Sequence, residues 1–241
     1  EMCIRDRNGP VQIYGGDVLQ YGNLSAAGPV LLKADISAYP YGNITVTGAG
    51  NRLSVQADDI IYTEANLSYF TNGGHIVFAS NLDNTDTGFI RMREGTRFNS
   101  VSTTGLRTAE TGGGHIYFGG QALDSNGFPT GYAFSSSSGE AGMDFWAGNE
   151  IQIHSGGGDI SLRGRADNVD NGLDIRNTSI TSGTGQILID GRSNLGSWHG
   201  VHIDYNVWEQ VRIQSGSNVV PAIRIRGEND TTATPAIATG W

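Results

Sequence analysis

The sequence predicts an all-β fold: a right-handed, single-stranded parallel β-helix of about seven coils, each made of three short strands. Three observations predict it. A strand-sized motif bracketed by glycines recurs along the chain, glycine is abundant at 36 of 241 residues, and patterns of helical period are lacking. Repetition of one short unit is typical of a solenoid, in which each coil buries its apolar face against its neighbours.

The motif reads Gly-x-φ-x-φ-x-Gly, where φ is an aliphatic residue or Phe. Its alternation of apolar and polar residues is the period of a strand with one buried face. The flanking glycines allow a positive φ, or a corner that has no room for a Cβ atom. Five strict copies lie at 9–15, 42–48, 114–120, 158–164 and 185–191, and two copies that each lack one glycine lie at 74–80 and 221–227.

The first apolar position of each copy is expected to form a single axial file on one sheet. The intervals between copies vary, which excludes a propeller or a helical array of fixed period. Longer loops or projecting hairpins are expected in the least regular stretches, 50–72, 98–111 and 122–148. The predicted file consists of Val11, Ile44, Ile76, Ile116, Ile160, Ile187 and Ile223.

Two further strands can be traced in many coils. The second is expected 12 to 15 residues after the first, behind Gly88, Gly131, Gly172 and Gly200. The third runs into a Ser-Gly pair, at 151–156, 178–183 and 211–216. Three such strands, joined by turns of Gly, Ser, Asn and Asp, would make one triangular coil.

Composition limits the partners of this chain. Its formal net charge is −9, which argues against nucleic acid and anionic membrane surfaces as partners, because both require clustered Lys and Arg. No apolar run approaches the roughly 18 residues of a membrane span, so direct membrane insertion is not expected. Cys3 is the single cysteine, so no disulfide framework or cysteine-based zinc site can form. No cofactor is predicted.

The first residues differ from the rest of the chain. The stretch from Glu1 to Arg7 is charged and does not fit the pattern that begins at Gly9. We therefore interpret residues 1–8 as a non-native leader. Residues 9–241 are expected to form one β-helix segment, which is a fragment of a larger protein.

The stretches Ile151–Ala166 and Ser182–Gly191 resemble the repeats of filamentous-haemagglutinin-like exoproteins. These are bacterial surface proteins exported by two-partner secretion or as autotransporter passengers. The chain lacks the Asn-Pro-Asn-Gly motif of that family's secretion domain, so the resemblance implies an interior segment. It further implies a secreted or cell-surface location, a structural and adhesive role, an outer-membrane transporter during export, and glycans or surface proteins of a host or the environment as partners.

An enzyme is the first alternative, since pectinase-like lyases and hydrolases that degrade polysaccharides are also β-helices. Their Asp pair, Gly-His-Gly and Arg-Ile-Lys sequences have their nearest matches in Asp58-Asp59, Trp198-His199-Gly200 and Arg224-Ile225-Arg226. The first match lies about four coils, or roughly 19 Å, from the second, which is too far for one active site. We therefore predict no catalytic residue and no enzyme.

A phage tail-spike segment is the second alternative, and it would require trimer contacts and a collar domain.

Aromatic side chains near the end of the chain are candidate carbohydrate contacts. Trp198, Tyr205 and Trp208 fall within one coil and could stack on sugar rings, although large aromatic residues also close the corners of solenoids.

His75 and His115 share one repeat position, and we expect an outward imidazole ladder there. A zinc site would need a further ligand at that position, so no metal site is predicted.

Two groups of polar residues are interpreted as turns. The aspartates Asp83, Asp86, Asp167 and Asp170 fit Asx turns, and a calcium consensus fails at Val169, although weak calcium binding stays open. The serine run 135–138 lacks the Gly-x-Ser-x-Gly elbow of a serine hydrolase and is expected to be a polar turn.

Overall fold

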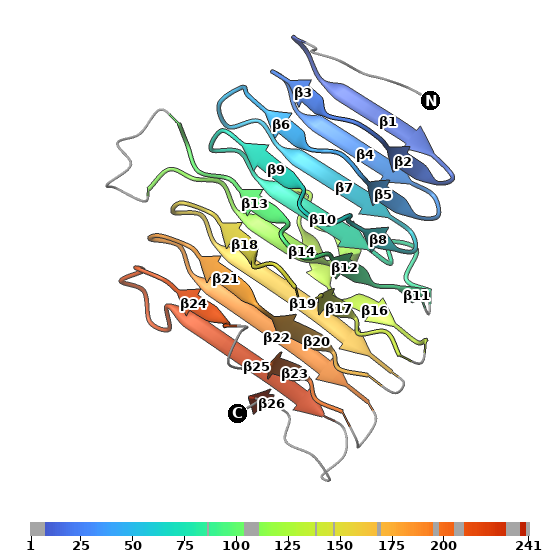
Figure 1. Ribbon diagram of the computed structural model, residues 1–241, viewed down its shortest axis with the longest axis vertical. Helices are drawn as coiled ribbons and strands as arrows, with labels where there is room; N and C mark the ends of the chain where they lie inside the picture. The colour runs from blue at the N-terminus through green and yellow to red at the C-terminus, as the bar shows by residue number, and fades with distance from the viewer. Residues whose placement is uncertain are drawn as a thin grey trace.

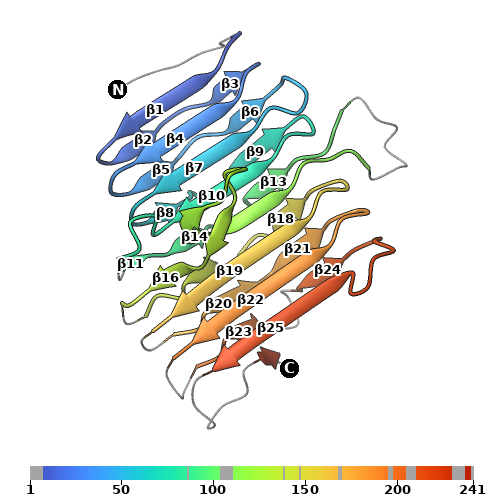
Figure 2. The ribbon, with the colours of Figure 1, turned by 180° about the vertical axis from the view of Figure 1, so that it is seen from behind.

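The structure is a parallel β-helix. The computed structural model describes residues 8–85, 87–103, 111–137, 139–146, 148–167, 170–194, 198–204, 210–229 and 237–239. Every element assigned within these ranges is a strand, and the strands stack into three sheets that run along the molecule (Figures 1 and 2). The predicted fold class is therefore confirmed. Of the predicted leader, only Asn8 lies within the described residues.

We number the three sheets in the order in which the chain enters them. The parallel strands of the first sheet are β1 (Val11–Gly15), β4 (Val30–Ala34), β7 (Leu53–Ala57), β10 (Ile76–Ser80), β14 (Ile116–Leu123), β19 (Ile160–Ala166), β22 (Ile187–Ser193) and β25 (Ile223–Asn229). The second sheet consists of β2 (Val18–Gln20), β5 (Ala38–Pro40), β8 (Ile61–Tyr62), β12 (Ile90–Met92), β17 (Met143–Phe145), β20 (Leu173–Arg176), β23 (Val201–Asp204) and β26 (Ile237–Thr239). The third consists of β3 (Leu24–Ala26), β6 (Ile44–Val46), β9 (Ser68–Thr71), β13 (Arg97–Asn99), β18 (Ile151–His154), β21 (Thr178–Thr181) and β24 (Arg212–Gln214).

The first axial file of the first sheet differs from the prediction at one position. Ile44 belongs to the third sheet, where it lies in register between Leu24 and Tyr69, so its placement in the file was wrong. The motif around Ile44 has the same two glycines, because tight corners flank strands of the third sheet as well. Register places these residues in the file: Val11, Val30, Leu53, Ile76, Ile116, Ile160, Ile187 and Ile223.

The coils are shorter at the beginning of the chain than the motif spacing implied. Val30 and Leu53 occupy places in the file that the motif did not identify, and their strands end in Ala34 and Ala57 where the motif has glycine. The first three intervals in the file are consequently 19, 23 and 23 residues. Eight described strands stack in this file, so the prediction of about seven coils is not confirmed.

The other two strands of each coil follow the prediction with one exception. The strands expected at 151–156, 178–183 and 211–216 are neighbours in the third sheet. Strands of the second sheet follow Gly172 and Gly200 directly, and β12 begins two residues after Gly88. Gly131 is the exception, since it ends β15 (Pro129–Gly131), and β17 begins twelve residues further on.

A hairpin projects from the middle of the first sheet (Figure 2). The end of β14 pairs antiparallel with β15, and β16 (Ala133–Ser135) then pairs parallel with the end of β19 and antiparallel with β11 (Thr87–Gly88). This hairpin begins at Gly120 and lies mostly within 122–148, where a projection was expected. The stretch 50–72 was also expected to be irregular, but it holds β7, β8 and β9 of an ordinary coil. In 98–111, residues 104–110 lie outside the described ranges.

The interior is a continuous apolar column that includes a cluster of buried aromatic rings. Phe98 is fully buried, and its ring centroid lies 5.1 Å from that of Tyr69, 5.4 Å from that of Phe78 and 4.9 Å from that of Phe118. These rings come from the first and third sheets of neighbouring coils. Their contacts hold the two sheets together across the interior of the helix.

Candidate functional site

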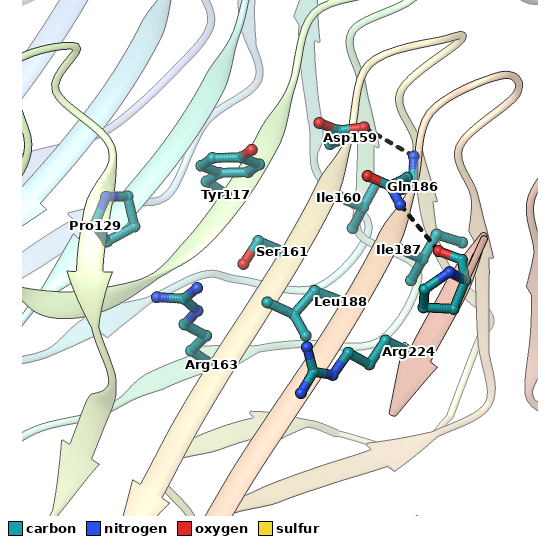
Figure 3. Close-up of a pocket in the computed structure, with 11 residues that line it drawn as sticks. Tyr117, Pro129, Asp159, Ile160, Ser161, Arg163, Gln186, Ile187, Leu188 and Arg224 are labelled. Atoms are coloured by element: carbon teal, nitrogen blue, oxygen red, sulfur yellow. Dashed lines mark hydrogen bonds between the residues drawn. The ribbon is translucent and has the colours of Figure 1, made fainter. Parts of the chain in front are cut away.

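The outer face of the first sheet carries an open groove of about 320 Å³. Its floor crosses β14, β19 and β22, the hairpin strand β15 forms one side, and the segment before β25 forms the other (Figure 3). Because residues alternate along each strand, the outward partners of the buried file line it. The lining includes Tyr117, Asp159, Ser161, Arg163, Leu188 and Arg224.

One rim of the groove is a ladder of side chains that accept backbone hydrogen bonds from the next coil. The backbone N–H of His115 donates to Nδ1 of His75 at 3.0 Å, and that of Asp159 donates to Nδ1 of His115 at 2.8 Å. The backbone N–H of Gln186 then donates to Oδ1 of Asp159 at 2.8 Å, and Gln186 Nε2 donates to the carbonyl oxygen of Pro221 at 2.9 Å. The ladder therefore links five successive coils, and its last three residues, Asp159, Gln186 and Pro221, line the groove.

The two histidines in the ladder stack as the sequence predicted. Their rings are nearly parallel, with centroids 5.0 Å apart and an angle of 8° between the planes. Each Nδ1 accepts a hydrogen bond, so each neutral ring carries its proton on Nε2. Burial lowers the pKa of His75 to about 4, and His115 and Arg52 add to the shift. Within the described residues, no group of three or more His, Cys, Asp or Glu side chains could hold a metal ion.

We expect the stability of the protein to fall as the pH drops from 6.5 to about 4, in part because His75 must be protonated. The unfolded chain binds the proton near pH 6.5 and the folded chain only near pH 4. The contribution of the neutral His75 ring to stability is therefore fully present above pH 6.5 and is lost as the pH falls to about 4. The loss should be on the order of 1–2 kcal/mol for this half-buried ring. Urea unfolding at several pH values measures it.

The variant for this prediction is His75→Gln, compared with the unaltered chain. It should flatten the pH dependence of the free energy of unfolding between pH 6.5 and about 4. An unchanged slope in His75→Gln would show that other groups cause the acid sensitivity.

The hairpin forms the wall of the groove through a cluster around Phe128. The Phe128 ring packs against Tyr117 with centroids 4.6 Å apart, and meets His75 edge-on at 5.1 Å. The guanidinium carbon of Arg52 lies 4.7 Å from the centroid of the same ring. These contacts pin the hairpin to the sheet and hold the ring of Tyr117 at the side of the groove.

Two arginines occupy the opposite end of the groove. Arg163 and Arg224 extend from β19 and β25, and Leu188 of the intervening strand lies between them (Figure 3). Arg163 Nη1 donates to the carbonyl oxygen of Thr130 at 2.9 Å, which ties it to the hairpin. Arg224 is exposed. The groove thus combines an aromatic ring, an aliphatic side chain, two arginines and, at its rim, the carboxylate of Asp159.

A second polar constellation lies on the outer face of the second sheet. Arg91, Asp144, Asp174 and His202 occupy equivalent positions on β12, β17, β20 and β23. Arg91 Nε donates to Asp144 at 3.0 Å, and Nδ1 of His202 lies 3.0 Å from Oδ1 of Asp174. Arg176 donates to the same carboxylate at 3.2 and 2.5 Å. The row therefore holds two neighbouring aspartates, both buried, between Arg91 and His202.

The pKa values of the two aspartates in this row are shifted in opposite directions. Burial raises the pKa of Asp144 to about 6, although Arg91 opposes the shift, and the negative charge of Asp174 adds to it. Burial would also raise the pKa of Asp174, but hydrogen bonds from His202 and Arg176 outweigh it and hold that pKa below its usual value. Two neighbouring carboxyl groups with separated pKa values are able to act as a proton donor and an anion.

Exposed aromatic side chains flank the charged row. Trp146 is 44% exposed, and the guanidinium carbons of Arg91 and Arg93 lie 5.0 and 5.6 Å from its ring centroid. Arg93 Nη1 also donates to the hydroxyl of Tyr62 at 2.6 Å. Arg91 and Arg93 are therefore both held by contacts within the chain.

Where it is described, the structure does not bring together the aromatic and pectinase-like residues that were proposed from the sequence. Trp198 is 36% exposed in the connection between β22 and β23, and its carbonyl oxygen accepts a hydrogen bond from Asn229 Nδ2 at 2.6 Å. Tyr205 and Trp208 lie outside the described residues. Of the three pectinase-like matches, only Arg224 lines the groove. Asp58-Asp59 follows β7, and four strands lie between β7 and β25 in the first sheet.

The predicted turns have local partners where they are described. Asp83 Oδ1 accepts hydrogen bonds from the backbone and hydroxyl of Thr85, as an Asx turn does. Asp167 is paired with Arg165, and burial raises the pKa of Asp170. Asp86, Val169 and Ser138 lie outside the described residues, while Ser135 is buried in β16.

The charged row and the groove were not identified from the sequence. Each residue of the row is the polar centre of an apolar-polar-apolar triplet, such as Met143-Asp144-Phe145, and these triplets read as ordinary strands. The signal that could have found the row is alignment of the second strands with one another. That alignment requires the lengths of the connections, which differ from coil to coil.

Comparisons with known proteins found no match: no family model, no curated protein and no solved structure matches the chain. The resemblance to filamentous-haemagglutinin-like exoproteins therefore stays a prediction. In the described ranges, no helix is long and apolar enough to cross a membrane.

Proposed function

We propose that this chain is a structural and adhesive segment of a secreted bacterial surface exoprotein, which binds glycans along the side of a stiff rod. The observation that carries the proposal is the groove on the outer face of the first sheet. It joins the apolar surfaces of Tyr117 and Leu188 to polar and charged groups, which is the combination that sugar rings require.

The rod-like stack supports this role through geometry. Each coil pairs with the coils on either side, so lateral surfaces are held at fixed distances along the axis. Weak contacts that are held at fixed spacing add up through multivalency. Trp198, Tyr205 and Trp208 remain proposed as additional carbohydrate contacts. An outer-membrane transporter is the partner that export of such a rod would need.

The test is retention of protein-coated beads under flow on surfaces that carry glycans or whole cells. Retention should rise more steeply than in proportion to the coating density, because several rods must engage together. Tyr117→Ala should reduce retention at least severalfold, because it removes the ring from the groove. Tyr14→Ala removes a 61% exposed tyrosine from the outer face of β1 and should leave retention unchanged. No retention on any surface at any density would contradict the proposal.

A polysaccharide-degrading enzyme is the second candidate, and one observation favours it. Asp144 and Asp174 lie in register on neighbouring strands, and their pKa values are shifted in opposite directions. Against this candidate, the two residues are only 7% and 2% exposed, and Asp174 is bound by Arg176 and His202. Release of reducing ends or unsaturated sugars that stops in Asp144→Asn would establish the enzyme instead of the adhesin.

A further inference from the structure

We propose that the groove selects acidic polysaccharides, whose carboxylate groups pair with Arg224 and Arg163 while a sugar ring lies against Tyr117 and Leu188. This inference rests on the proposed function, since it names the class of glycan that the same groove binds. It comes from the distribution of charge on the outer face of the first sheet.

The last strands of the first sheet carry more arginines than acidic residues, although the whole chain carries −9. The last three parallel strands, β19, β22 and β25, contain five arginines and only two acidic residues, Asp190 and Glu228. All seven alternate with the buried file and lie on the outer face. A local excess of positive charge on an acidic chain raises the local concentration of anionic ligands there.

Three of these five arginines already pair with carboxylates of the chain itself, two of them with the same Glu228. Arg165 makes two hydrogen bonds of 2.7 Å to the carboxylate of Asp167. Arg192 lies 2.9 Å from a carboxylate oxygen of Glu228, and Arg226 pairs with the other oxygen of the same group. These three arginines are therefore occupied by ion pairs within the chain.

The remaining two arginines are the two that line the groove. Among the described residues, neither Arg163 nor Arg224 has a carboxylate within ion-pair distance, and Arg163 bonds only to the carbonyl oxygen of Thr130. A guanidinium group binds a carboxylate through two parallel hydrogen bonds, which an isolated ammonium group cannot do. The two arginines that have no carboxylate partner are thus the two that line the groove, and this points to an anionic ligand.

The shape and polarity of the groove favour a polysaccharide over other anions. The groove is open and lies on the outer face of a sheet, so an extended chain can lie in it. Tyr117 and Leu188 provide apolar surface for the faces of sugar rings, and Ser161 provides a hydroxyl group for their edges. A phospholipid headgroup or an inorganic anion would leave this apolar surface uncovered.

The experiment measures binding of the whole chain to polygalacturonate by calorimetry, with its methyl-esterified form and dextran as uncharged polymers. Polygalacturonate should bind, and raising the salt concentration from 0.05 to about 0.5 M should weaken binding. Both uncharged polymers should bind at least tenfold more weakly. Arg224→Gln should weaken polygalacturonate binding about tenfold, and Arg224→Lys should restore only part of it.

The matched control is Arg97→Gln, which removes an exposed arginine from β13 of the third sheet. It should leave the affinity for polygalacturonate unchanged. Equal binding of the methyl-esterified polymer, or equal losses in Arg224→Gln and Arg97→Gln, would overturn the assignment of an acidic ligand while leaving glycan adhesion intact. Equal binding of phosphatidylglycerol vesicles would overturn the choice of a polysaccharide. Failure of the bead assay on every surface would instead remove the proposed function.

Discussion

Replacing Phe98 with alanine should lower the free energy of unfolding by about 3–5 kcal/mol, which is the usual cost of removing a fully buried aromatic side chain. Phe98 is 0% exposed, and its ring contacts those of Tyr69, Phe78 and Phe118. The cavity would lie where these rings connect the first and third sheets. Because each coil is stabilised only by its neighbours, we also expect the two halves of the rod to unfold in separate steps.

Chemical denaturation followed by circular dichroism and tryptophan fluorescence would measure this effect. Phe70→Ala is the matched control, because Phe70 lies on β9 beside Tyr69 but is only partly buried on the outer face. It should cost less than about 1 kcal/mol. Similar losses in the two variants would mean that the aromatic column does not determine the stability of the middle coils.

Replacing Gly158 with alanine should destabilise the protein by about 3 kcal/mol, at the upper end of the cost of overpacking. A Cβ atom at Gly158 would lie 2.2 Å from the carbonyl oxygen of Gly114 and 2.6 Å from the backbone nitrogen of His115. These are backbone atoms of the preceding coil, so no side chain can rotate away. The coils would have to separate at this corner, which would also strain the ladder through Asp159 at the rim of the groove.

Gly9→Ala is the matched control, since Gly9 opens the first copy of the same motif and a Cβ atom there meets nothing within 4 Å. We expect it to be neutral or to stabilise slightly, because alanine restricts the unfolded chain. Thermal unfolding of both variants would compare them. A Gly158→Ala protein as stable as Gly9→Ala would refute the view that glycine permits the close approach of coils.

Part of the candidate site followed from the sequence. His75 and His115 share a repeat position, and the structure stacks their rings. A repeat position that recurs in successive coils is a local property of the motif, so this prediction needed no knowledge of the loops. Asp159 continues the same ladder, but its role as an acceptor for the backbone of Gln186 appears only when the coils are stacked.

The error at Ile44 shows the limit of the motif. Glycines flank this strand of the third sheet as they flank strands of the first, whereas the strands of Val30 and Leu53 lack the second glycine. Glycine marks a corner without room for a Cβ atom, and a triangular coil has more than one such corner. The motif therefore identifies a strand but not the sheet to which that strand belongs.

The sequence by itself determined the fold class, because alternation of apolar and polar residues, abundant glycine and the lack of helical period are all local properties. Only the tertiary structure decided which polar side chains meet. Asp144 approaches Asp174, and Arg163 and Arg224 flank Leu188, because stacking places residues from separate coils about 4.8 Å apart per strand. The connections between coils differ in length, so this register follows from packing of the whole column rather than from the spacing of any motif.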